Sequence, residues 1–359
     1  MSGLTPLTAV TAPDPYDYYQ RLVAHAPFAF DERVNAWVAA SASAVEAVLS
    51  HPALRVRPAT DPIPHAMRGT AIGAAFERLA RMNDGPTHRH LRHAAVTAVE
   101  AWSVGTLASI AASCAQARAQ KIGASADSLN AYLHEMPAMT IATMLEIDRQ
   151  RDALTWIRDF ARAIAPAATP GDVERGSAAV EALHDVFSER MTEDELASSL
   201  GFLFQTYDAT AGLIGQIFAT IVARRTIPDD AGLDVLLAAA VRYDAPVHNT
   251  RRFAVNDVAI ANCTIRKGDA VLALLAAANR DPLGAKSFTF GLGPHACPGA
   301  QMAVSIARAG VCALTENVDL SAVSMAGYQP SLNCRIPTFE ISGAALRQAQ
   351  GDEGSITAS

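Results

Sequence analysis

Residues 290–300 place one cysteine between a glycine-rich turn and a helix-forming segment, and this stretch constrains the chain more than any other. Gly291 and Gly293 allow the backbone to adopt positive φ and allow a flat ligand to approach closely. Cys297 then falls where the helix is predicted to begin, with Pro298 in a first-turn position that tolerates proline. Because a helix N-terminus stabilises an anion, we expect the sulfur to be poised as a thiolate.

The single thiolate restricts the metal groups that this loop can hold. Its surroundings lack the Cys and His ligand spacing of a zinc site. A lone thiolate suits one axial bond to haem iron. The alternative is a buried cysteine that follows a glycine turn and binds nothing.

The order Phe-Gly-x-Gly-x-His-x-Cys-x-Gly resembles the haem-binding signature of the cytochromes P450, and similarity to that family extends over about residues 15–342. The resemblance implies heme b with its iron axially ligated by Cys297. It also implies a mainly α, triangular-prism fold with small β-sheets, in which the haem lies between a long central helix and the cysteine loop. Loop residues that would then contact the cofactor are Phe290, Gly291, Gly293, His295 and Gly299.

Length and composition fit such a protein. The chain has 359 residues, half of them hydrophobic, so it can bury a sizeable core. We expect residues 1–345 to form a single haem domain and residues 346–359 to be a disordered tail. The net charge of −7 argues against a nucleic-acid partner.

The cysteines and the N-terminus indicate a cellular compartment. Five cysteines at irregular spacings are typical of reduced thiols in a cytosol rather than of a disulfide framework. The first residues have no basic region followed by an apolar segment. We therefore expect a cytoplasmic protein without signal peptide or membrane contact.

A pair of residues near position 90 suits carboxylate binding. His88 and Arg92 are four residues apart, so they share one face of a predicted helix. In the resembled family a His-x-x-x-Arg pair at this place grips the haem propionates, and the resemblance adds Arg252 and His295 to the same role. The alternative is a solvated basic face, which better explains the neighbouring Arg89, His90 and His93.

Residues 192–225 are predicted to form one long helix. Thr192 and Glu195 have the spacing of a capping box, and the helix would be about 50 Å long. Polar residues at its centre exclude a membrane span, and polar groups inside a buried helix need partners. We therefore expect a functional site at residues 205–210.

This polar centre resembles the family's oxygen-activation segment but departs from it. Asp208 keeps the acid and Thr210 keeps the second hydroxyl, whereas Ala209 replaces the catalytic threonine. Gln205 replaces a small residue, and Thr206 replaces the glycine that opens the helix. The resemblance gives Asp208 and Thr210 catalytic roles. We predict that Gln205 lies over the iron with Ala209 beside the cofactor. The alternative is that all are satisfied polar core residues.

A second departure concerns the network of charged side chains that the family builds around a Glu-x-x-Arg motif. Ala239 stands where the family's Glu-x-x-Arg motif has its glutamate, three residues before Arg242. Only seven residues separate Pro282 from Phe290, where the family has a longer meander with a second arginine. Because both partners are missing, we expect Arg242 to bind a backbone carbonyl or water, or to be exposed.

Three functions stay open at this point. The first is a P450-type monooxygenase or related haem-thiolate oxidoreductase that acts on a small organic molecule in biosynthetic tailoring, with a ferredoxin-type redox partner. The second is a haem-thiolate enzyme outside the usual dioxygen cycle, using peroxide or catalysing dehydration, rearrangement or coupling. The third is a haem-binding sensor without turnover, which tolerates every departure above.

Overall fold

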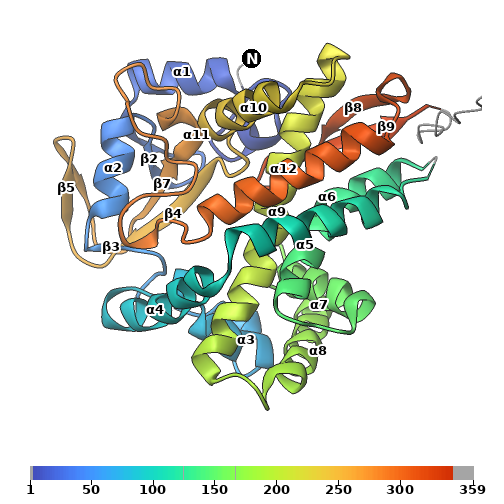
Figure 1. The fold of residues 1–359 in the computed structure, drawn as a ribbon. Helices are drawn as coiled ribbons and strands as arrows, with labels where there is room; N and C mark the ends of the chain where they lie inside the picture. The colour runs from blue at the N-terminus through green and yellow to red at the C-terminus, as the bar shows by residue number, and fades with distance from the viewer. Residues whose placement is uncertain (1–2, 124, 166, 343–359) are drawn as a thin grey trace, which may run out of the picture.

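The computed structural model describes residues 3–342 apart from residues 124 and 166, and the described chain is mainly helical with small sheets, as predicted (Figure 1). The helices are α1 (Tyr16–His25), α2 (Ala42–Ser50), α3 (Ala71–Arg78), α4 (Gly85–Ala101), α5 (Val104–Ala119), α6 (Ala126–Met144), α7 (Gln150–Ala163), α8 (Pro170–Phe187), α9 (Glu193–Arg224), α10 (Asp230–Tyr243), α11 (Leu275–Ala278) and α12 (Ala300–Asn317). The predicted tail, residues 346–359, lies outside the described residues.

Helix α9 is the long central helix that the sequence predicts. It spans 32 residues, and both capping-box hydrogen bonds between Thr192 and Glu195 are present at its start. It ends where Arg225 adopts the left-handed conformation, with φ at 54°. Helices α4, α6 and α12 pack against it, so residues at its centre are surrounded by other elements (Figure 1).

The strands are β1 (Phe28–Asp31), β2 (Ala36–Ala39), β3 (Leu54–Arg55), β4 (Asn249–Ala254), β5 (Val258–Ile260), β6 (Cys263–Ile265), β7 (Ala270–Leu274), β8 (Val323–Tyr328) and β9 (Pro337–Ile341). One sheet has the order β1-β2-β7-β4-β3, and β5-β6 and β8-β9 form two-stranded sheets. In β4, Arg252 is buried while its neighbour Arg251 is exposed, since successive side chains point to opposite faces.

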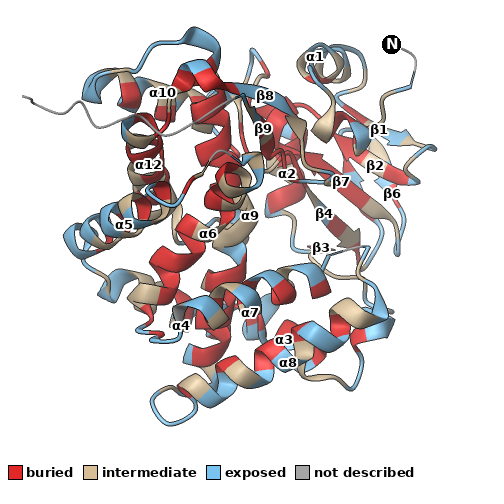
Figure 2. Ribbon diagram, turned by 90° about the vertical axis from the view of Figure 1, so that its right-hand side faces the viewer, coloured by how far each residue is buried: buried red, intermediate tan, exposed pale blue. Residues whose placement is uncertain are grey.

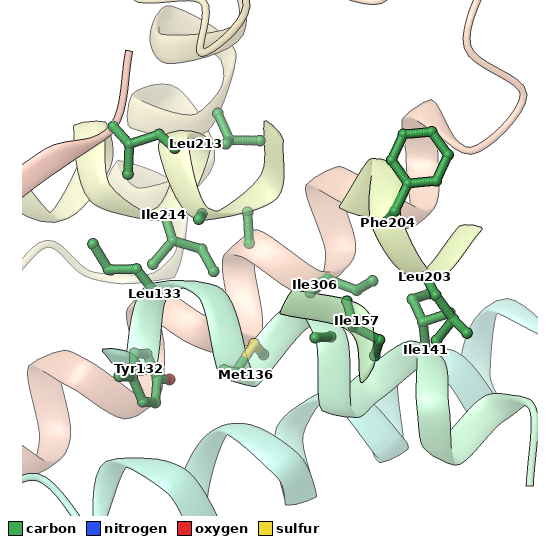
Figure 3. Packing of buried hydrophobic residues seen from close by; sticks show 14 of the residues in the cluster. Tyr132, Leu133, Met136, Ile141, Ile157, Leu203, Phe204, Leu213, Ile214 and Ile306 are labelled. Carbon is green, nitrogen blue, oxygen red and sulfur yellow. The ribbon is translucent and has the colours of Figure 1, made fainter. Parts of the chain in front are cut away.

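The main hydrophobic core lies between α9 and the helices packed on it. Figure 2 shows buried residues along α6, α9 and the larger sheet, with exposed residues on the outer faces. Ile214 of α9 and Leu133 and Met136 of α6 lie at the centre of this core (Figure 3). The core fixes the position of α9 relative to α12 and therefore relative to the loop that precedes α12.

No single helix in the described parts of the chain is long and apolar enough to cross a bilayer. The consecutive helices α4 and α5 reach that length and composition only when joined, and they are bent by 80° at their junction.

Candidate functional site

The loop before α12 has the backbone conformation that its glycines predict. Gly291 and Gly293 have φ values of 72° and 69°, which side chains other than glycine rarely adopt. A Cβ on Gly293 would lie 3.3 Å from the carbonyl oxygen of Leu49, so the loop also approaches α2 closely. The backbone N–H of Cys297 donates to the carbonyl of Phe290 at 2.7 Å and closes the loop.

The start of α12 differs from the prediction. The helix begins at Ala300 with Gly299 as its N-cap, so Pro298 precedes the helix instead of occupying its first turn. The reason is that the first helical hydrogen bond runs from the N–H of Ala303 to the carbonyl of Gly299, and residues 298–299 form a turn. Cys297 therefore stands beside the helix start rather than within it.

The thiol of Cys297 is accessible and yet surrounded by protein. Its residue is exposed by surface area, whereas burial is the largest influence on its pKa and raises it. The N–H of Gly299 and the charges of Arg92 and Arg81 act in the opposite direction and lower the pKa. We expected the helix N-terminus to poise the sulfur as a thiolate, but burial instead raises the pKa of the thiol, and a coordinating metal ion would deprotonate it.

Two of the predicted carboxylate-binding residues lie together. The ring centroids of His88, from α4, and His295, from the cysteine loop, are 4.2 Å apart. Nε2 of His295 lies 3.2 Å from Oδ1 of Asp84, and Oδ2 of Asp84 accepts a hydrogen bond from the N–H of Val56. Burial and then the charges of His295 and Arg92 lower the pKa of His88 to about 4.

Arg252 is a buried cation in need of an anion. Its residue is 4% exposed, and burial lowers its pKa to about 10. Nη1 donates to Oγ1 of Thr250 and to the carbonyl of Arg251, which are uncharged acceptors. Among the described residues, no carboxylate lies within ion-pair distance of Arg252 or of Arg92, although the charge of Asp84 is near enough to act on Arg252. Since buried charges are normally paired, this site fits a ligand that brings its own carboxylates.

The donor set agrees with a cofactor held by one thiolate. No group of three or more His, Cys, Asp or Glu side chains in the described chain could hold a metal ion by itself. The residues present therefore fit haem, which carries its iron in a macrocycle, needs one axial protein ligand and bears carboxylates. Haem would take the thiolate of Cys297, with Arg92 and Arg252 available for its carboxylates.

Asp208 of α9 has a partner that the sequence did not reveal. Its Oδ1 lies 3.4 Å from Nδ1 of His134 on α6, and the His134 ring packs against Tyr207 at a tilt of 35°, with centroids 4.7 Å apart. Nε2 of His134 lies 3.0 Å from Nε2 of Gln329 and 3.2 Å from its Oε1. A titratable pair therefore sits at the polar centre of α9. Thr210 is buried within the helix packing.

Gln205 and Ala209 lie on one face of α9, which stays helical through Thr206. The side chain of Gln205 is exposed, but its Nε2 donates to the carbonyl of Gly201 at 2.8 Å. The amide thus bonds to a carbonyl of its own helix and leaves Oε1 as an acceptor. Its placement over a cofactor stays a prediction.

A cleft of about 700 Å³ lies away from Cys297, among α3, α4 and α9. Its lining includes Arg78 of α3, His90 of α4 and Asp194 of α9; Asp194 lies 2.8 Å from the guanidinium of Arg78 and 2.6 Å from Nε2 of His90. None of the predicted cofactor or catalytic residues lines it. We assign the site to the surroundings of Cys297, because the unpaired cations and the thiol converge there and not at this cleft.

Comparisons with known proteins concern the sequence and the fold as a whole. No family model matches the chain. A Xylella fastidiosa protein named cytochrome P450 133B2 is 24% identical over 84% of this chain and 88% of its own length. The biotin biosynthesis cytochrome P450 of Bacillus subtilis is 32% identical over 32% of this chain and 34% of its own length.

Solved structures show the same fold. The crystal structure of CalO2 superposes with a TM-score of 0.75 at 19% identity, covering 97% of this chain and 99% of that one. Sequence relatives, fold and the cysteine loop together lead to one conclusion: the chain is similar in sequence to bacterial cytochromes P450 and has the cytochrome P450 fold.

Proposed function

We propose that this protein binds heme b through Cys297 and oxidises a small organic molecule as a monooxygenase in biosynthetic tailoring, with electrons from a ferredoxin-type partner. The observation that carries the proposal is the buried Arg252, which lacks a carboxylate partner among the described residues and belongs to the same site as the accessible thiol. When bound, the haem supplies the oxygen-activating chemistry of the family.

Four residues hold the propionates in this proposal. Arg92 and Arg252 provide fixed positive charges, and the imidazoles of His88 and His295 provide hydrogen-bond donors. Without an anion beside it, His88 is neutral because its pKa is about 4. A propionate in contact would raise that pKa, so cofactor binding and protonation of His88 support each other.

Asp208 handles protons in this proposal. Its Oδ1 lies 3.4 Å from Nδ1 of His134, which has no hydrogen-bond partner among the described residues, so a water between them would complete a proton path beside the centre of α9. Ala209 has no hydroxyl to carry the proton onward. Thr210, bound water or a hydroxyl of the substrate takes that role, and the substrate lies on the face of α9 that presents Gln205 and Ala209.

A haem titration tests the proposal with a matched pair of variants. Arg252→Gln removes the buried cation, whereas Arg251→Gln removes the exposed cation of the adjacent residue on β4. Haem added to the haem-free form should bind the Arg251 variant like wild type and the Arg252 variant at least about tenfold more weakly, the scale of one charge-assisted hydrogen bond. Equal haem affinity in both variants would remove Arg252 from the cofactor site.

A second candidate function is favoured by one observation. Helix α9 remains helical through Thr206 and carries no hydroxyl at Ala209, so the usual proton path of the family is incomplete. A haem-thiolate enzyme that uses peroxide, or that catalyses dehydration, rearrangement or coupling, does not need that path. Turnover supported by hydrogen peroxide but not by a ferredoxin, its reductase and NADH would favour this candidate over the first.

A further inference from the structure

Arg81 brings an unexpected cation next to α9. It lies in a short 3-10 helix, Ala80–Met82, between α3 and α4. Its guanidinium carbon lies 5.6 Å from the ring centroid of Phe204 on α9. Figure 3 shows the Phe204 ring on the side of α9 away from Leu203, and that ring packs against Phe160 of α7 with centroids 5.2 Å apart. Arg81 therefore lies on the side of α9 that α7 covers.

Arg81 lies near Cys297. Arg81 is exposed to solvent, whereas Phe204, whose ring its guanidinium contacts, is buried. Burial nonetheless lowers its pKa, and the groups that act against this are the thiols of Cys334 and Cys297. A side chain that contacts Phe204 of α9 and is influenced by the thiol of Cys297 lies between α9 and the cysteine loop.

Arg81 has no anionic partner in the described part of the chain. Neither a hydrogen bond nor an ion pair to its guanidinium is found there, and its contact with Phe204 is a cation–π contact. Asp84, the nearest acid in sequence, is already engaged by His295 and by the N–H of Val56. An accessible guanidinium whose donors are unused by the described residues is free to bind an anion.

The propionates do not require this cation. Arg92 and Arg252 already supply as many permanent positive charges as a haem has propionates. The charge of Arg92 acts on His88, and that of Arg252 acts on Asp84, which His295 contacts. The charge of Arg81 also reaches Arg252 and lowers its pKa, so this third cation adjoins them. Arg81 contacts α9 instead, on the face covered by α7. Its charge is therefore available to a molecule that lies between α9 and the cofactor.

We propose that Arg81 is a specificity-determining residue that binds an anionic group of the substrate, a carboxylate or a comparable small oxyanion. The proposal rests on the proposed haem-thiolate function and adds the substrate class. The planar guanidinium can donate two parallel hydrogen bonds to such a group. The rings of Phe204 and Phe160 offer an apolar surface nearby, and Oε1 of Gln205 offers one acceptor. The substrate is thus an amphipathic organic anion.

Matched acids and amides test this inference on the haem-loaded protein. The probes are decanoate with decanamide and 3-phenylpropanoate with 3-phenylpropanamide, each titrated by calorimetry and by the Soret band. The variants are Arg81→Gln, Arg81→Lys and, as the control, Arg68→Gln, which removes an exposed arginine paired with Asp61.

The expected result is a preference for at least one acid over its amide of about tenfold or more in wild type and in the Arg68 variant, as for a hydrogen bond to a charged group. Arg81→Gln should abolish that preference, Arg81→Lys should keep part of it, and both should retain haem. Equal binding of acid and amide in wild type, or a preference that survives Arg81→Gln, would overturn the inference.

Two further outcomes separate this inference from the proposed function. Haem loss in Arg81→Gln to the extent expected for Arg252→Gln would mean that Arg81 serves the cofactor, which overturns the inference and leaves the proposed function intact. A wild-type protein that takes up no haem would overturn both.

Discussion

Replacement of Arg242 by methionine is expected to lower the free energy of unfolding by about 2 kcal/mol. Arg242 lies in the last turn of α10, where Nη2 donates to the carbonyl of Gly284 at 2.6 Å and Nη1 donates to the carbonyl of Lys286. Hydrogen bonds from a charged donor contribute about 1.5–3 kcal/mol each when buried, and the half-exposed position here lets water replace part of that. The two bonds tie α10 to the short loop that leads to residue 290.

A second substitution tests whether Arg242 is stable without the missing glutamate and second arginine. Ala239→Glu would place a carboxylate three residues before Arg242 on the same helix, which is worth about 0.3–0.5 kcal/mol. Urea unfolding of the haem-loaded variants at pH 7.5 measures both effects. A gain of roughly 3 kcal/mol or more from Ala239→Glu would show that Arg242 is an uncompensated buried charge. A loss below about 0.5 kcal/mol from Arg242→Met would show that the carbonyl contacts carry no stability.

Three other predictions concern acidity, the thiolate and α9. Burial lowers the pKa of His248 to about 3. The neutral buried imidazole therefore stabilises the fold fully above pH 6.5, and the free energy of unfolding falls by about 2 kcal/mol at pH 5 as the unfolded chain takes up protons. Urea unfolding above pH 6.5 and at pH 5 should show a smaller difference in the free energy of unfolding for His248→Asn than for wild type. An equal difference in both proteins contradicts this. Pro298→Leu should raise the reduction potential in a potentiometric titration, because a new N–H would join that of Gly299 near the sulfur; an unchanged or lower potential argues against it. Gln205→Ala should alter substrate affinity or products and Ala209→Thr should alter the coupling of electrons to product, whereas wild-type behaviour in both would make this helix scaffolding.

Local patterns explain which features were predictable. The capping box of Thr192 and the positive φ of Gly291 each depend on a few neighbouring residues, and the structure confirms both. The prediction for Arg242 was also correct, since it binds backbone carbonyls. That inference needed only the absence of two charged partners and the rule that a guanidinium seeks acceptors.

Contacts between distant segments were not predictable. The partner of Asp208 is His134, which comes from α6, and Asp84 meets His295 from the far end of the chain. No spacing in the sequence signals such pairs, because they depend on how helices pack. Arg81 was missed for the same reason, since only the fold brings it beside Phe204.

The carbon monoxide spectrum of the reduced, haem-loaded protein tests the central claim most directly. If Cys297 is the axial ligand, dithionite and carbon monoxide should give wild type the red-shifted band of a thiolate-ligated haem. Cys297→Ser should lack that band, and serine variants of the other cysteines should keep it: Cys114, Cys263, Cys312 and Cys334. A Cys297→Ser protein with the wild-type spectrum would contradict the assignment of the ligand, and a wild-type protein that binds no haem would contradict the account as a whole.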